Sequence, residues 1–275
     1  MSVAADVEIL KKRIDHYLWR SSPKPAAILR GLLSEHFGQF DRIAIIGGLV
    51  RDLARVGTMG FKSDIDLVID APYQLVAELA QKISAIPNRF GGYAYHHPQW
   101  KIDFWSLETT WAATNGHVHV RRLGDLVDCT FFDWDAALYD LRARKVICKG
   151  DYLDTIRRNQ MDINLLHTPS IEGNLLRAVR RLLMWNLSAG PKLRKFIDEN
   201  LTTDRFERMA ATERTLYASA VLCKVRNVDG LFSYLYDFEA RAKLNTSFGS
   251  QLVLPGVEMD PGRINHSSFK ERLHD

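Results

Sequence analysis

The feature that most constrains this chain is a pair of apolar, β-branched runs, each with polar residues at one end. Ile43-Ala44-Ile45-Ile46 leads directly into Gly47-Gly48, and Leu67-Val68-Ile69 directly follows Asp64-Ile65-Asp66. Runs of this length and composition predict short buried strands. A glycine turn leaves backbone amides open to an anion, and two acidic side chains on one strand can hold a cation. We therefore expect polar chemistry at the ends of buried strands.

Hydrophobic periodicity predicts the elements around these strands. Apolar residues recur at near-helical spacing over 5–19 and 25–37, and a helix is expected to begin near Leu49. A flexible connection is expected from Gly57 to Lys62, and a helix from Pro72 to about Ile86. Further strands are expected over 89–96, 99–107 and 144–147, and only helices after Ser170, over 174–187, 191–200, 204–223 and 228–243.

The order of these elements predicts an α+β fold, in which a small mixed sheet flanked by helices precedes an all-α part. The pattern changes from mixed α/β to all-α near residue 170, which is the best candidate for a domain boundary. We predict N-terminal helices over 1–38, the sheet-containing domain over 39–168, a helical part over 169–244 and an extended tail over 245–275.

Composition narrows the class of protein. The 275 residues are 46% hydrophobic and 25% charged, with a formal net charge of +4, as expected of a soluble globular protein that tolerates an anionic partner. Cys129, Cys148 and Cys223 are odd in number and lack metal-like spacing, which favours buried reduced thiols. With no signal-peptide core and no apolar run of roughly 20 residues, we expect a cytoplasmic protein without a membrane partner.

The acidic residues form the candidate catalytic set. Residues i and i+2 of a strand face the same way, so Asp64 and Asp66 should project together. Two carboxylates this close repel each other unless a cation neutralises them, and oxygen ligands favour Mg²⁺ or Mn²⁺. A site with two metal ions needs a third carboxylate from a neighbouring strand, and Asp103 is the candidate.

Less specific explanations exist for each residue on its own. An isolated Asp-x-Asp is most often a solvated strand end or turn. Asp103 could be a surface residue or the partner of Arg89 or Lys101. The glycine turn, the acidic pair and the third carboxylate are much harder to obtain together by chance, which favours metal-dependent chemistry on a phosphate.

Arginines are the candidate anion ligands. Arg177, Arg180 and Arg181 have spacings that place them near one another on a helix, where they could hold a triphosphate or an RNA backbone. The alternative is a solvated helix face. Arg51 follows the glycine turn and could either contact phosphate or brace the helix with Asp52, for which a structural role is favoured.

These residues together resemble the head domain of the class II tRNA nucleotidyltransferases and bacterial poly(A) polymerases, in the DNA polymerase β-like superfamily. The family's Gly-Gly-x-Val-Arg-Asp matches 47–52, and its Asp-x-Asp matches Asp64 and Asp66. Its Tyr-Asp segment is similar to 136–140, and its Leu-Arg-Ala-x-Arg neck helix is similar to 176–180. The resemblance, over roughly 40–190, implies two Mg²⁺ ions at the acidic residues, with Gly47 and Gly48 at the phosphates.

The resemblance also implies a reaction, namely transfer of a nucleotide from a nucleoside triphosphate to an acceptor hydroxyl. An RNA 3′ end, and a tRNA in particular, is the favoured acceptor. The family's Arg-Asp before the Tyr-Asp segment is missing from 129–136, and its base-pairing Asp and Arg are missing from 170–174. The alternatives are transfer of the nucleotide to a protein or small molecule, or a relative that binds nucleotide or RNA without turnover.

Overall fold

The computed structural model describes residues 2–57, 61 and 63–237. Its centre is a seven-stranded mixed sheet with the order β3-β4-β5-β2-β1-β6-β7. Within this sheet β2 and β5 run parallel, and the other neighbouring pairs run antiparallel. The strands are β1 (Ile43–Ile46), β2 (Ile65–Ile69), β3 (Ile86–Pro87), β4 (Tyr93–His97), β5 (Trp100–Ser106), β6 (Ala137–Asp140) and β7 (Lys145–Cys148).

Alternation along the strands gives the sheet two different faces. Ile43, Ile45, Ile65 and Leu67 point into a large core that the N-terminal helices also fill. The opposite face carries a smaller apolar cluster, which includes Val68. Because Asp64 and Asp66 have the parity of Val68, their side chains belong to this second face.

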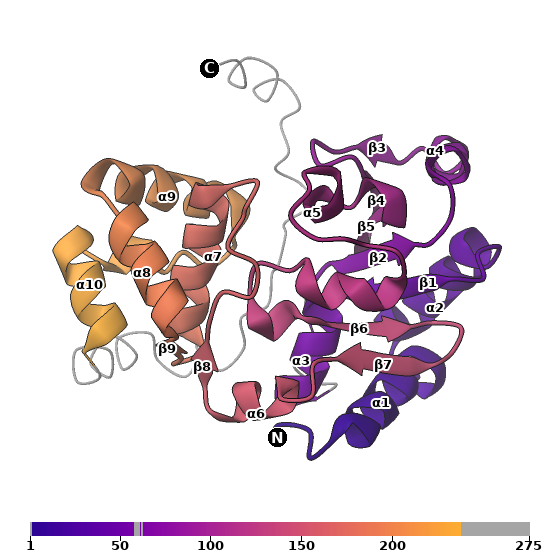
Figure 1. The fold of residues 1–275 in the computed structure, drawn as a ribbon, viewed down its shortest axis with the longest axis horizontal. Helices are drawn as coiled ribbons and strands as arrows, with labels where there is room; N and C mark the ends of the chain where they lie inside the picture. Colours follow the sequence, from indigo (N-terminus) through magenta and orange to yellow (C-terminus); the bar gives the residue numbers. More distant parts are fainter. Residues whose placement is uncertain (1, 58–60, 62, 238–275) are drawn as a thin grey trace.

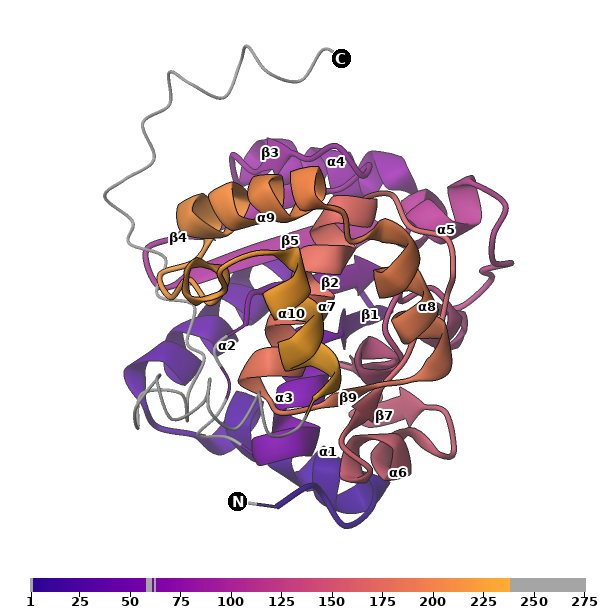
Figure 2. The same cartoon turned by 90° about the vertical axis from the view of Figure 1, so that its left-hand side faces the viewer.

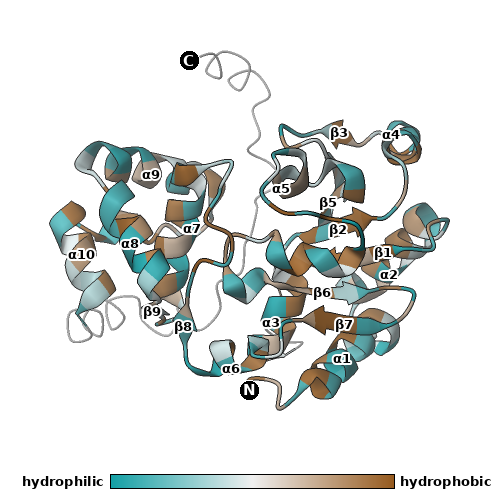
Figure 3. Cartoon of the chain, in the orientation of Figure 1, coloured by the Kyte–Doolittle hydropathy of each residue, from teal (hydrophilic) through white to brown (hydrophobic). Residues whose placement is uncertain are grey.

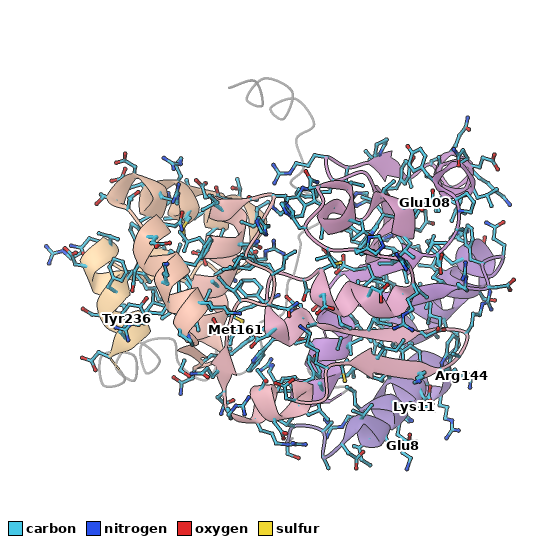
Figure 4. All side chains as sticks on the ribbon, viewed as in Figure 1. Glu8, Lys11, Glu108, Arg144, Met161 and Tyr236 are labelled. Carbon is cyan, nitrogen blue, oxygen red and sulfur yellow. The ribbon has the colours of Figure 1, made fainter. Side chains whose placement is uncertain are left out.

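The N-terminal helices pack against the large-core face of the sheet. They are α1 (Val7–Asp15), a π-helical turn (His16–Arg20) and α2 (Lys24–Phe37). Trp19 Nε1 donates a hydrogen bond to Tyr139 Oη on β6 at 3.3 Å, and that hydroxyl in turn donates to Asp15. Arg144, on the turn between β6 and β7, lies close to α1 in Figure 4 and places its guanidinium 5.0 Å from the Trp19 ring centroid.

Short helical segments complete the part of the chain that contains the sheet, which we call the head. They are α3 (Gly48–Val56), α4 (Tyr73–Lys82), η3 (Leu107–Thr109), α5 (Trp111–Thr114), η4 (Leu123–Asp128), η5 (Asp133–Asp135) and α6 (Tyr152–Arg157). The helix expected from Pro72 to Ile86 ends early, at Lys82. Ser84 adopts a left-handed φ of 55°, which breaks the helix, and Ile86 then enters the edge strand β3.

The remaining helices form what we call the helical part, which lies beside the head in Figure 1 and in front of the sheet in Figure 2. They are α7 (Ile171–Met184), α8 (Pro191–Asn200), α9 (Thr203–Leu216), η6 (Leu222–Lys224) and α10 (Val228–Tyr236). Helix α9 is shorter than the expected 204–223. The buried hydrophobic residues of α7–α10 belong to the same cluster as those of the N-terminal helices, so a continuous core joins the two parts. In Figure 3 the helices carry both hydrophobic and hydrophilic residues.

A two-stranded parallel sheet of β8 (Gln160–Met161) and β9 (Ser188–Ala189) also joins the head to the helical part. Next to it, Asp162 Oδ1 accepts a hydrogen bond from the Leu193 amide at 2.7 Å and so caps α8. A Cβ on Gly190 would come within 2.4 Å of Asp162 Cγ, so this approach requires glycine. Neither short strand has a signal in the hydrophobic pattern.

Several expectations concern residues outside the described ranges. Most of the flexible connection over 57–62, the end of the helix expected over 228–243 and the tail over 245–275 belong to this group. The domain boundaries at 38, 168 and 244 stay predictions.

Cys129 and Cys148 are partly buried, but Cys223 is exposed, contrary to the expectation of buried thiols. Within the described residues, every helix is too short or too polar to cross a membrane.

Candidate active site

The glycine turn lies at the same end of the sheet as the acidic residues. Ile46, the last residue of β1, pairs with Asp66 on β2. Gly47 has φ +72°, a conformation that favours glycine, and α3 begins at Gly48 without a side-chain cap. The amides of the first helical turn have no intrahelical partner and point outward from a positive helix end. The turn therefore offers backbone donors to an anion beside Asp66.

Gly48 is needed for a close approach. A Cβ at this position would lie 2.8 Å from Ser63 Cβ, immediately before the acidic pair. Ser63 Oγ donates a hydrogen bond to Asp52 Oδ2 at 2.7 Å. The first turn of α3 and the start of β2 are thereby held together, and the structural role expected for Asp52 agrees with these contacts.

The three predicted carboxylates come together on one face of the sheet. Asp66 and Asp103 are direct partners across the parallel pair β2 and β5, and Asp64 precedes Asp66 by two residues. Lys101 Nζ lies 3.1 Å from Asp64 Oδ2 and 2.7 Å from Asp103 Oδ2. Asp103 is therefore a partner of Lys101, as the alternative explanation predicted. It also lies on the same face as Asp64 and Asp66, so the two explanations do not exclude each other.

The charges in this cluster leave Asp66 in an unfavourable environment. Burial raises the pKa of Asp66 to about 7, and the nearby carboxylates of Asp103 and Asp64 add to the increase, while Lys101 opposes it. An ionised Asp66 would thus be stabilised by an added cation. Burial opposes the charge of Lys101, but Asp64 and Asp103 raise its pKa well above the ordinary value.

The donor set fits a hard divalent cation. Asp64, Asp66 and Asp103 supply carboxylate oxygens from adjacent strands, which is the ligand type that Mg²⁺ and Mn²⁺ prefer. Two of these carboxylates already bind a cation, the ammonium of Lys101. Within residues 2–57, 61 and 63–237, no three His, Cys, Asp or Glu side chains form a preformed metal centre. Carboxylates facing a lysine in this way must turn before they can share an ion.

A second charged cluster lies at the junction of the head and the helical part. Arg51 Nη1 donates to Asp135 Oδ1 at 2.6 Å, and Arg181 Nη1 donates to Asp135 Oδ2 at 2.7 Å. Burial alone would raise the pKa of Asp135, but Arg181 and Arg51 lower it to about 2. Burial lowers the pKa of Arg181 to about 10, against the attraction of Asp135. One carboxylate thus joins an arginine of α3 to an arginine of α7.

The same junction carries stacked aromatic and guanidinium groups around Trp185, which directly follows α7. The Arg55 and Arg51 guanidinium carbons lie 4.4 Å and 5.0 Å from the centroid of its ring. Trp134 stacks against it with 6.1 Å between centroids and 16° between planes. Desolvation by burial lowers the pKa of Arg55. The junction is therefore both cationic and closely packed.

The structure separates the predicted arginines. Arg51 is 5% exposed and is bonded to Asp52, Ser63 and Asp135, so it braces α3. Arg181 is bonded to Asp135, as described above. Arg177 is exposed and donates to the side chain of Asn174, which leaves it accessible to a phosphate.

Arg180 requires a correction. It is 7% exposed, forms a buried ion pair with Glu213 of α9, donates to the Ser219 carbonyl at 2.9 Å and lies over the ring of Tyr217. The predicted phosphate contact is wrong because the guanidinium is enclosed by the helical part. Arg194 and Lys195 form exposed pairs one helical turn apart with Asp198 and Glu199, as expected of a solvated face.

The sequence analysis missed Asp135 and Ser63. Asp135 lies in Phe131-Phe132-Asp133-Trp134-Asp135, and an acid inside such an aromatic run has to find a cationic partner when it is buried. That signal was present in the sequence. For Ser63, whose hydroxyl bridges Arg51 and Asp52, the sequence carries no signal beyond proximity to Asp64.

Comparison with known proteins identifies the fold. No family model matches the chain, and neither does any curated protein. Among solved structures, a CCA-adding enzyme of Thermotoga maritima in complex with tRNA matches 89% of this chain with a TM-score of 0.52 and 18% identity, over 55% of the enzyme. A CCA-adding enzyme solved with CTP matches 90% with a TM-score of 0.51 and 17% identity, over 56% of that enzyme.

The fold is thus that of the head and neck of tRNA nucleotidyltransferases, which confirms the α+β class and the resemblance in fold. The chain spans little more than half the length of these enzymes. At this level of identity the likeness concerns the arrangement of the chain.

Proposed function

We propose that this protein is a Mg²⁺-dependent nucleotidyltransferase that moves a nucleoside monophosphate from a nucleoside triphosphate to an acceptor hydroxyl and releases pyrophosphate. The observation that carries the proposal is the pairing of Asp66 with Asp103 across β2 and β5, with Asp64 on the same face and the Gly47-Gly48 turn beside it. The likeness in fold to CCA-adding enzymes supports it.

Each residue has a role in this proposal. The amides after Gly47 bind the phosphates, because they are open donors at a positive helix end. Asp64, Asp66 and Asp103 would hold two Mg²⁺ ions, with Mn²⁺ as a substitute. When bound, these ions acidify the acceptor hydroxyl and neutralise charge on the phosphates. Arg177 is the exposed arginine of the predicted set that could contact phosphate.

Arg51 and Arg181 act indirectly. Their shared bond to Asp135 fixes α3, which carries the glycine turn, relative to α7, which carries Arg177. A rigid arrangement of the two helices fixes the position of the backbone donors relative to the exposed guanidinium of Arg177. This is a positioning role, because neither guanidinium is free.

We propose an RNA 3′ end, and specifically that of a tRNA, as the acceptor. The support is the likeness in fold to an enzyme solved with tRNA. The family's base-pairing Asp and Arg are replaced here by Ile171 and by Asn174, a buried residue that donates to Thr168 Oγ1 and accepts from Arg177. We therefore propose a base preference different from that of a faithful CCA-adding enzyme.

The test is incorporation of α-labelled nucleotides. Purified protein, Mg²⁺, total RNA and each of the four nucleoside triphosphates are incubated, and the products are resolved on a denaturing gel. We expect label in RNA, and a loss of at least about 100-fold in the double variant Asp64→Asn with Asp66→Asn, because the ions and their charge stabilisation are lost. The same variant should fold normally in EDTA, since it removes repelling carboxylates. Label in protein would change the acceptor, and no incorporation anywhere by folded protein would refute the proposal.

A further inference from the structure

Lys101 is the charged residue of the acidic site that has no role in the proposed reaction. It precedes Asp103 by two residues on β5, so both side chains lie on the same face of the strand. It directly precedes the Ile65–Ile102 pair in the register of β2 with β5, and so lies opposite Asp64. Its ammonium is bonded to carboxylates from both strands, at 3.1 Å and 2.7 Å.

The position of this ammonium differs from that of an ordinary surface ion pair. Its side chain is 28% exposed, and those of Asp64 and Asp103 are 42% and 22% exposed. A single nitrogen is shared by two acids, at a site where three carboxylates repel one another. Lys101 therefore supplies positive charge where the site needs it.

The ammonium and a divalent ion cannot occupy this place together. Mg²⁺ binds carboxylate oxygens at about 2.0–2.1 Å, so the oxygens that now face Lys101 Nζ would have to turn toward the ion. The ion and the ammonium would then lie within a few ångströms of each other and repel. The lysine stem has four carbons and rotates freely, so the ammonium can leave while β5 stays in place.

We propose that Lys101 is a tethered cation that competes with the divalent ion for Asp64 and Asp103, so that metal binding requires its ammonium to leave both carboxylates. This inference rests on the proposed function in taking these carboxylates as metal ligands. It makes Lys101 a positioning residue that holds the carboxylates together without metal and sets the metal concentration at which the site fills.

The experiment is a calorimetric titration of the metal-free full-length protein with Mn²⁺ and with Mg²⁺. Lys101→Met keeps the length of the side chain and removes the charge, and we expect it to bind Mn²⁺ at least about 10-fold more tightly than the wild type. Lys101→Arg keeps the charge and should bind like the wild type. Lys145→Met is the matched control, because Lys145 is an exposed lysine on the far edge strand β7, and it should leave the affinity unchanged.

A second measurement separates competition from a merely structural role. In EDTA, Lys101→Met should melt at a lower temperature than the wild type, because the carboxylates lose their counter-charge. The increase in melting temperature on adding Mg²⁺ should be larger for Lys101→Met than for the wild type. An unchanged or weaker affinity of Lys101→Met would overturn the inference, as would a failure of both proteins to bind either metal.

The two proposals can fail separately. If Lys101→Met gains affinity while no form of the protein transfers a nucleotide, the competition is supported and the proposed function fails. If the wild type transfers nucleotide and Lys101→Met shows no gain in metal affinity, the proposed function is supported and the competition fails.

Discussion

Asp133 and Asp135 lie two residues apart in η5, but their carboxyl groups have opposite environments. Asp135 is held between Arg51 and Arg181 and stays ionised, with a pKa of about 2. Asp133 accepts a hydrogen bond from the Asp162 amide, at 3.0 Å, and burial raises its pKa to about 7. At neutral pH Asp135 therefore contributes a fixed negative charge, whereas Asp133 titrates.

The raised pKa of Asp133 makes stability depend on pH. Between the unfolded pKa of about 3.9 and the folded value near 7, the native state keeps a proton that the unfolded chain has lost, so stability falls as pH rises. Asp133→Asn keeps an acceptor and has no proton to lose. We expect the free energy of unfolding of the variant, relative to the wild type, to increase by about 1–3 kcal/mol from pH 4 to pH 8.

Urea unfolding in EDTA across this pH range measures the difference between the two proteins, which cancels the contributions of other groups such as Asp66. Parallel pH profiles would show that Asp133 does not titrate in this window.

Helix α3 illustrates how an element can depend on one close contact. Its first turn carries the open amides, and its second residue, Leu49, is buried in the large core. Gly48 lies against Ser63, and this contact brings the helix end to the acidic strand. The geometry of the proposed phosphate site therefore depends on the absence of a side chain at Gly48.

Gly48→Ala tests this dependence. The added Cβ would lie 2.8 Å from Ser63 Cβ, so the segment before β2 has to move. We expect a loss of about 1–3 kcal/mol in the free energy of unfolding and weaker binding of Mg²⁺ with a nucleoside triphosphate. Gly31→Ala is the control, because Gly31 is exposed within α2 with open space around it, and this change should stabilise the protein by about 0.5–1 kcal/mol. Equal effects of the two substitutions on binding would contradict the argument.

The predictability of these elements follows from how local their determinants are. β1 and β2 were predictable because β-branched runs bounded by glycine or aspartate specify buried strands without outside help. The start of α3 near Leu49 was predictable from hydrophobic periodicity, which is also a local pattern. The direction in which the Arg180 side chain points was not predictable. Neighbouring residues on a helix can point to different partners, and its partner Glu213 lies 33 residues further along the chain. The Lys101 bridge required the register of β2 with β5, which no local pattern states.

At the scale of the whole molecule, the head and the helical part are joined by apolar packing, by the short β8–β9 pairing and by one shared carboxylate. Asp135 is 16% exposed at its side chain, and its arginine partners on α3 and α7 are 6% and 14% exposed. Arg51 also pairs with Asp52, so the two guanidinium groups are balanced by two carboxylates only while the shared Asp135 is ionised. The pKa of about 2 means that this condition holds throughout the neutral range.

Asp135→Asn should therefore weaken the junction more than the loss of one ion pair would suggest. The asparagine is neutral, so Arg51 keeps only the counter-charge of Asp52, and Arg181 is left largely buried without the carboxylate that balances it. We expect the free energy of unfolding to fall by about 3–5 kcal/mol, measured by urea denaturation at pH 7. Asp154→Asn is the matched control, since Asp154 pairs with Arg157 at the surface with its side chain 60% exposed, and this change should cost less than about 1 kcal/mol. If both substitutions had the same small effect, Asp135 would not hold α3 and α7 together, and the relative position of the glycine turn and Arg177 would have to depend on apolar packing and the β8–β9 pairing.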